Sequence, residues 1–173
     1  MLIDEINLKV KAGDGGDGLV SFYTNRKGPD GGNGGDGGDV VAKAVRDIMV
    51  LRNYAQNKVY EAEDGKPGGR QKKTGADGED LVLEVPVGST LINKQTKEEI
   101  DLDKQGETAV IAQGGKGGRG NWEFRSSTNT TPKQAEPGEP GEKFTYHVVL
   151  HLIADFGLIG LPSVGKSSLL NEL

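Results

Sequence analysis

Residues 28–40 read GPDGGNGGDGGDV, and the glycines of this stretch recur at every third position, at Gly28, Gly31, Gly34 and Gly37. Polyproline II has three residues per turn, so this spacing places the glycines along one edge of an extended segment and lets neighbouring segments approach at backbone distance. The same period occurs in five further segments: 13–16, 65–68, 75–78, 114–120 and 138–141. We therefore predict a packed bundle of six polyproline-II-like helices rather than six flexible loops.

The order of these segments pairs them into three out-and-back hairpins. Their turns, called the tips, lie at residues 19–27, 71–74 and 121–137. A β-sheet domain, called the platform, has to hold the base of such a bundle. Short stretches in which apolar and polar residues alternate predict the strands of this domain. We expect a mostly β domain over residues 1–155, a small β-barrel or sandwich, with strands at 6–10, 40–51, 81–87, 108–112 and 144–152. We interpret the acidic stretch 98–103 as solvated surface.

Composition narrows the class of protein. The chain has 173 residues, a formal charge of −5 and no cysteine, which excludes a disulfide scaffold and thiolate-bound zinc. It has no apolar run of 18 residues, so we expect no membrane span, and its first residues do not resemble a secretory signal. These features predict a soluble protein of the cytoplasm, and we expect a monomer.

Basic residues gather at the tips. Residues 19–27, 66–74 and 116–135 together carry a net +9, so the other 135 residues carry −14. If the tips point the same way, they form a cationic end on an anionic body, which favours oriented docking on phosphate. RNA is favoured over duplex DNA because no recognition helix is available for a major groove. Trp122 and Phe124 lie in the third tip, where an aromatic ring could stack on an unpaired base or, alternatively, pack in a core. The candidate RNA contacts are Arg26, Lys27, Arg70, Lys72, Lys73, Lys116, Arg119, Trp122 and Arg125.

A phosphate-binding motif stands at the carboxyl end. Residues 160–167, GLPSVGKS, match the pattern G-x-x-x-x-G-K-S between an apolar strand-like run and a helix-like start. We expect Lys166 to reach the β- and γ-phosphates and Ser167 to ligate Mg²⁺. The predicted nucleotide-binding residues are Gly160, Leu161, Pro162, Ser163, Val164, Gly165, Lys166, Ser167 and Ser168.

The position of this motif bears on catalysis. Six residues follow Ser167, and no Asn-Lys-x-Asp motif for guanine is present. We therefore expect a glycine-rich domain at 1–155 and the start of a truncated α/β P-loop domain at 156–173. This chain alone is expected to hold no catalytic residue and to be inactive.

Four segments together resemble the Obg family of GTPases: 28–40, 74–89, 114–142 and 154–167. The resemblance implies the Obg fold, in which glycine-rich helices stand on a small β-barrel, followed by a GTPase domain. It also implies a late assembly factor of the large ribosomal subunit that is linked to ppGpp and the stringent response. The tips around Arg26, Lys72, Lys73 and Asn121–Arg125 would then contact rRNA, and Gly160–Ser167 would bind GTP or GDP with Mg²⁺.

This sequence departs from the family pattern in the first tip, where residues 23–27 (YTNRK) are shorter and less basic than expected. Two other classes stay open at this stage. One is a P-loop ATPase with a glycine-rich protein-interaction module, and the other is a structural module in which the bundle is a spacer.

Overall fold

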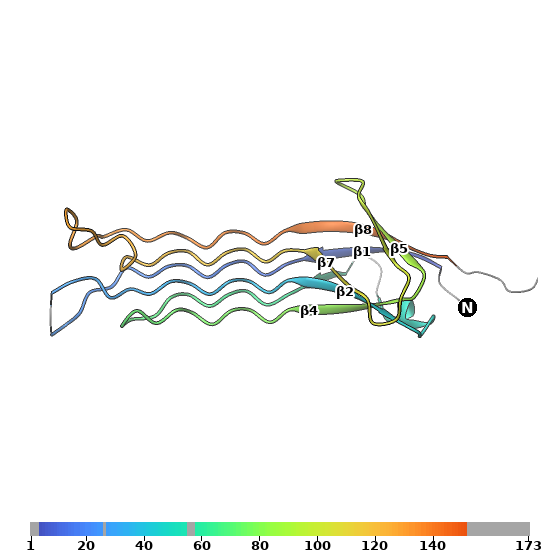
Figure 1. Cartoon of the computed structure of the whole chain (residues 1–173), viewed down its shortest axis with the longest axis horizontal. Coiled ribbons are helices and arrows are strands. Elements are labelled where there is room, and N and C mark those ends of the chain that lie inside the picture. The colour runs from blue at the N-terminus through green and yellow to red at the C-terminus, as the bar shows by residue number, and fades with distance from the viewer. Residues whose placement is uncertain (1–3, 26, 55–57, 152–173) are drawn as a thin grey trace, which may run out of the picture.

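The molecule is a long, narrow body with two parts (Figure 1). The computed structural model describes residues 4–25, 27–54 and 58–151. Short β-strands form a platform at one end, and the glycine-rich segments run from it side by side as a shaft. The chain is mostly strand and extended backbone, and the described helix is a single 3₁₀ turn, η1 (Val50–Asn53).

The platform consists of two sheets. One has the order β3-β1-β8-β5-β6 and the other the order β4-β2-β7. The strands are β1 (Glu5–Lys11), β2 (Val40–Val45), β3 (Val59–Glu61), β4 (Leu81–Pro86), β5 (Ser89–Asn93), β6 (Glu99–Leu102), β7 (Thr108–Ala112) and β8 (Lys143–Leu150). β1 pairs with β3, and β2 with β4, in parallel, and every other described pair is antiparallel.

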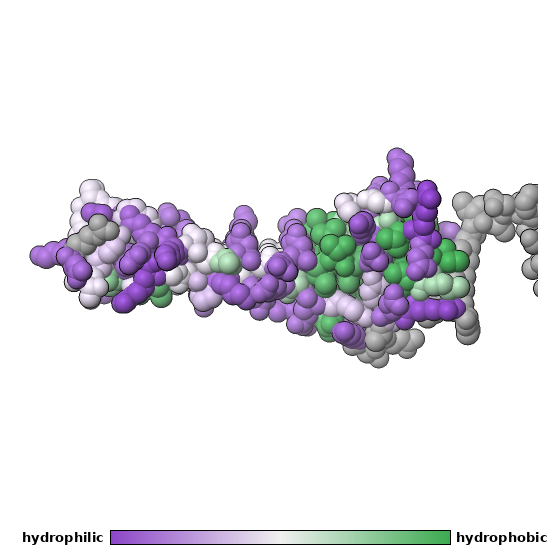
Figure 2. Space-filling view, turned by 90° about the horizontal axis from the view of Figure 1, so that it is seen from below, coloured by the Kyte–Doolittle hydropathy of each residue, from purple (hydrophilic) through white to green (hydrophobic). Residues whose placement is uncertain are grey.

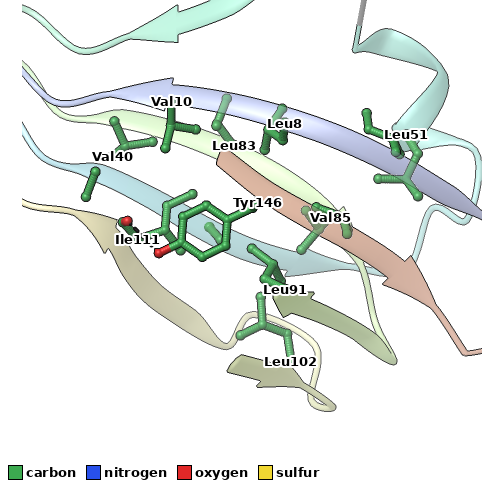
Figure 3. Close-up of a cluster of buried hydrophobic side chains, with 14 of the residues drawn as sticks. Leu8, Val10, Val40, Leu51, Leu83, Val85, Leu91, Leu102, Ile111 and Tyr146 are labelled. Carbon is green, nitrogen blue, oxygen red and sulfur yellow. Dashed lines mark hydrogen bonds between the residues drawn. The ribbon is translucent and has the colours of Figure 1, made fainter. Parts of the chain in front are cut away.

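The expected β-barrel is wrong, because the two sheets do not close on one another. The reason is visible between β4 and β5, which are consecutive in the chain but lie in different sheets. Pro86 ends β4 and has no backbone N–H for the sheet, and the chain then turns at Gly88, whose φ is +81°. Both sheets contribute to one apolar core, in which Leu8, Leu83 and Tyr146 are buried (Figure 3).

The sequence patterns predict the positions of five strands correctly, although one of these five is shorter than expected. They miss three further strands. The expected strand at 40–51 ends at Val45, and the chain then forms η1. β3, β5 and β6 have no counterpart in the prediction. The interpretation of 98–103 as solvated surface is confirmed for its four carboxylates, which are all exposed, but the stretch also contains β6 and buries Leu102.

The shaft segments are held together by backbone hydrogen bonds at every third residue. Gly13, Gly16 and Leu19 donate to the carbonyls of Gly38, Gly35 and Gly32, a register that descends by three and is therefore antiparallel. In the second hairpin Lys66 donates to Ala76, and in the third Glu139 donates to Lys116. This network confirms the predicted pairing into three hairpins.

Glycine is required in the shaft by the close approach of neighbouring backbones. A Cβ atom built on Gly34 would overlap the carbonyl group and Cα of Gly16, and one built on Gly118 would overlap the carbonyl of Glu136. Backbone atoms cannot move aside as a flexible side chain can. The period of three in the sequence is therefore the period of these backbone contacts.

Acidic and amide side chains add a second set of cross-links with the same period. Asn33, Asp36 and Asp39 accept hydrogen bonds from the backbone N–H groups of Gly120, Gly117 and Gly114, at 2.8, 2.7 and 2.7 Å. Asp17 and Asp14 hold Gly138 and Gly141 in the same way, both at 2.9 Å. Much of the negative charge of the shaft thus has a structural role.

Candidate functional site

The three tips lie together at the end of the shaft that is remote from the platform (Figure 1). The hairpin that carries residues 71–74 ends short of the other two. Side-chain contacts join the tips into one surface, so the condition for a cationic end, that the tips point the same way, is met.

Asn121 links the first and third tips. Its side chain is fully buried, and its Oδ1 accepts a hydrogen bond from the backbone N–H of Gly31 at 2.9 Å. Its Nδ2 donates to the carbonyl oxygens of Ser21 at 3.0 Å and Pro132 at 3.1 Å. A buried amide with three partners fixes these loops relative to one another.

Asp30 fastens the second tip. Gln71 and Lys72 both have a φ of 60°, a left-handed conformation that costs free energy in residues other than glycine. The backbone N–H of Gln71 donates to Oδ2 of Asp30 at 3.2 Å, and that of Lys72 donates to the Asp30 carbonyl at 2.7 Å. Arg70 adds a bond from Nε to Oγ of Ser21 at 3.1 Å. The first hairpin therefore stabilises the strained turn that carries basic residues of the second tip.

Trp122 lies at the junction of the second and third tips. The Nζ atom of Lys72 is 3.0 Å from the centre of its ring, and the Arg125 guanidinium carbon is 6.0 Å from it. The ring is half-buried. Trp122 is thus a tip residue rather than a platform core residue, and a cation covers one face of its indole.

Six cations among the described residues belong to this surface: Lys27, Arg70, Lys72, Lys73, Arg125 and Lys133. All six residues are exposed. None of them makes an ion pair within the part of the chain that the structure describes. Figure 2 shows hydrophilic residues over the tips and shaft, while hydrophobic ones gather at the platform. Unpaired positive charge at the end of an acidic body attracts a polyanion and orients it.

Two of the predicted contact residues lie on the shaft instead. Arg119 forms two hydrogen bonds with the carboxylate of Glu136, at 2.7 and 2.8 Å, and its guanidinium carbon is 5.1 Å from the centre of the Phe124 ring. The bonds raise the pKa of Arg119 and lower the pKa of Glu136, so both stay charged and neutralise each other. Lys116 is exposed in the middle of its segment. The structure does not bring these two cations to the tip surface.

The remaining candidates lie outside the described residues. They are Arg26 and the whole phosphate-binding motif, Gly160–Ser168. Within residues 4–25, 27–54 and 58–151, no group of three or more His, Asp or Glu side chains is placed to hold a metal ion. No helix in the same ranges is long and apolar enough to cross a membrane.

Comparisons with known proteins agree with the architecture. The sequence profile of the GTP1/OBG family matches residues 3–152. The chain is 46% identical to "GTPase Obg" of Nautilia profundicola over 100% of its length and 50% of that protein. It is 45% identical to "GTPase Obg" of Leptospira biflexa over 99% of its length and 52% of that protein. The chain spans about half the length of these curated relatives. It follows from the profile match that this chain belongs to the GTP1/OBG family.

Proposed function

We propose that the tip surface docks this protein on RNA, and that this RNA is the rRNA of the large ribosomal subunit during its late assembly. One observation carries the proposal: the unpaired cations of three separate hairpins converge at one end of an otherwise acidic body. Phosphate contacts dominate the affinity of proteins for nucleic acid, so such an end binds RNA while the body is repelled.

The shape of the molecule supports a folded RNA as the target. A narrow shaft can enter a cavity that a globular domain cannot, and folded RNA exposes unpaired bases in such places. The backbone cross-links and the buried Asn121 keep the shaft and its loops rigid. The three-residue period of the hydrogen bonds also leads us to propose that the six shaft segments are polyproline II helices.

We propose further that Gly160–Ser168 binds GTP or GDP, with Mg²⁺ on Ser167, and that the whole protein hydrolyses GTP in the cytoplasm and responds to ppGpp. The motif G-x-x-x-x-G-K-S supports phosphate binding. The name "GTPase Obg" of the relatives favours guanine over adenine. The 173 residues alone are proposed to be inactive in hydrolysis.

The docking proposal is tested by co-sedimentation of this chain with purified large ribosomal subunits across a salt series. One variant carries Arg70→Glu, Lys72→Glu and Lys73→Glu at the tips. A control carries Lys94→Glu, Lys97→Glu and Lys104→Glu, three exposed cations of the platform, and has the same net charge. We expect the unmodified chain to bind with an affinity that falls steeply as the salt concentration rises. The tip variant is expected to lose this binding, and the platform variant is expected to keep it. Equal loss in both variants would contradict docking through the tips.

The nucleotide proposal is tested on the full-length protein with a fluorescent guanine nucleotide. Lys166→Ala is expected to abolish binding of the triphosphate, and Ser167→Ala to remove the dependence of affinity on Mg²⁺. Retained affinity in Lys166→Ala would contradict this assignment.

A further inference from the structure

A pocket of about 450 Å³ lies between the first and second tips. Its lining includes Phe22, Tyr23 and Asp30 from the first hairpin and Arg70 and Gln71 from the second. A volume of this size accommodates a nucleoside. The pocket combines aromatic surface, a carboxylate and a guanidinium, and neither the candidate contacts nor the phosphate-binding motif accounts for it.

Asp30 is the unusual member of this lining. Its side chain is buried, with 3% of the residue exposed, and its Oδ2 accepts the bond from the Gln71 N–H. Its Oδ1 is buried and accepts no hydrogen bond from any residue that the structure describes. Leaving a buried carboxylate oxygen without a donor is costly, so such an atom calls for a specific explanation. An N–H donor that enters the pocket would supply the missing bond.

We propose that this pocket receives an unpaired guanine of the docked RNA. A carboxylate only accepts hydrogen bonds, and guanine is the standard RNA base with two neighbouring N–H donors, N1–H and N2–H₂, on its Watson–Crick edge. Phe22 and Tyr23 provide surface on which a base can stack. The Nε of Arg70 is held by Ser21, and its terminal nitrogens make no hydrogen bond with the described residues, so they are available to a phosphate.

The inference rests on the proposed docking function and adds a base preference to it. Because Oδ1 is buried, part of the pocket lining has to shift for the base edge to reach it. Gln71 belongs to this lining, and the turn at Gln71 and Lys72 has a strained backbone. A change in the conformation of this turn can therefore relieve strain.

The test measures the affinity of the 173-residue chain for single-stranded RNA of about seven nucleotides by fluorescence anisotropy. One probe is oligouridine with a central guanosine, and the others carry adenosine or inosine at that position. We expect the guanosine probe to bind roughly tenfold more tightly than the adenosine probe. The affinity for the inosine probe, which lacks the N2 amine, is expected to lie between the other two affinities. This comparison needs no change in the protein.

Asp30→Asn tests the carboxylate directly. The amide oxygen can still accept from the Gln71 N–H, but an NH₂ donor then replaces Oδ1, so the preference for guanosine is expected to disappear. Glu123→Gln is the matched control, because it removes the same charge from an exposed site on the third tip and is expected to keep the preference. Thermal unfolding of both variants shows whether they fold.

The outcomes separate this inference from the docking proposal. If the wild type shows no preference, or if Asp30→Asn and Glu123→Gln behave alike, Oδ1 holds only a water molecule and the guanine site is wrong. Co-sedimentation with ribosomal subunits would still stand in that case. If the nucleoside guanosine, which has no phosphate for Gly160–Ser168, displaces the probe at micromolar concentration, the pocket is a free-nucleoside site and the assignment to RNA is overturned.

Discussion

The side-chain ammonium of Lys72 lies 3.0 Å from the centre of the Trp122 indole ring, which brings the second tip onto the third. One face of the only tryptophan in the chain is therefore occupied by a cation that also belongs to the proposed phosphate-binding surface. If RNA docks on the tips as proposed, its phosphates and the indole ring will compete for the same ammonium group. A base can stack on this face of Trp122 only after Lys72 has moved to the backbone of the RNA.

This relationship predicts that Trp122 reports on docking. Since the chain has one tryptophan, fluorescence excited selectively in tryptophan comes from this site alone. We expect single-stranded RNA to change the emission of Trp122, and Lys72→Ala to shift it in the absence of RNA. Lys116→Ala, which removes a cation from the shaft, serves as the control and is expected to leave the spectrum unaltered. Identical spectra for Lys72→Ala and the wild type would argue against the contact.

The buried amide of Asn121 predicts a large effect on stability. Asn121→Ala leaves the Gly31 N–H and two carbonyl oxygens without their partner, which is expected to lower the free energy of unfolding by about 3 kcal/mol. Urea denaturation measures it. Asn25→Ala, at an exposed position of the first tip, is expected to change stability by about 0.5 kcal/mol or less. Similar values for the two variants would contradict the role assigned to Asn121.

The close packing of the shaft predicts that its glycines differ in tolerance. Gly34→Ala drives a methyl group into the backbone of Gly16, and we expect a loss of about 3 kcal/mol or more. Gly69→Ala meets the Cβ of Lys73 at 3.2 Å, a contact that a small shift relieves, and should cost far less. Denaturation curves of the two variants test the comparison, and a Gly34→Ala protein as stable as the wild type would refute the packing.

The raised pKa of the Tyr54 hydroxyl predicts that the folded protein loses stability at alkaline pH. Burial raises the pKa of this hydroxyl from 10.0 to about 12, and the protonated hydroxyl donates a hydrogen bond to the Glu84 carbonyl at 2.7 Å. The folded state therefore keeps the proton between pH 10 and pH 12, where the unfolded state releases it. Stability is expected to fall as pH rises through this range.

Phenolate absorbance and urea unfolding at several pH values measure this behaviour. Tyr54→Phe is expected to flatten the dependence of stability on pH above 10. A dependence in Tyr54→Phe as steep as in the wild type would assign the effect to another group.

The sequence predicts the parts of the fold that repeat. Alternation finds β1 because Ile6, Leu8 and Val10 all face the core, and the glycine period finds the hairpins because every third residue contacts a neighbouring backbone. β6 is hidden because its exposed face is acidic and resembles a solvated loop, although Leu102 is buried. The family resemblance is confirmed, but the barrel that it implies is wrong, since the two sheets remain open.

The site is less visible in the sequence. Charge clustering predicts a cationic end, but it cannot distinguish Lys73, which is unpaired, from Arg119, which is neutralised by Glu136. The aspartate cross-links carry a signal that the sequence reading missed, because Asn33, Asp36 and Asp39 share the period of the glycines. Asp30 stands three residues before Asn33 and so continues this series, but only the structure shows that its Oδ1 lacks a partner among the described residues and that the residue lines a pocket.

Tethered hydroxyl-radical probing tests whether the tips, and not the platform, lie against the rRNA. The chain has no cysteine, so a single introduced thiol carries the iron chelate at one known place. Ser127→Cys places it on the third tip, and Gln105→Cys places it on the platform, both at exposed positions. With large ribosomal subunits, we predict discrete cleavage of the rRNA from Ser127→Cys and little from Gln105→Cys. Strong cleavage from Gln105→Cys, with none from Ser127→Cys, would contradict docking through the tips.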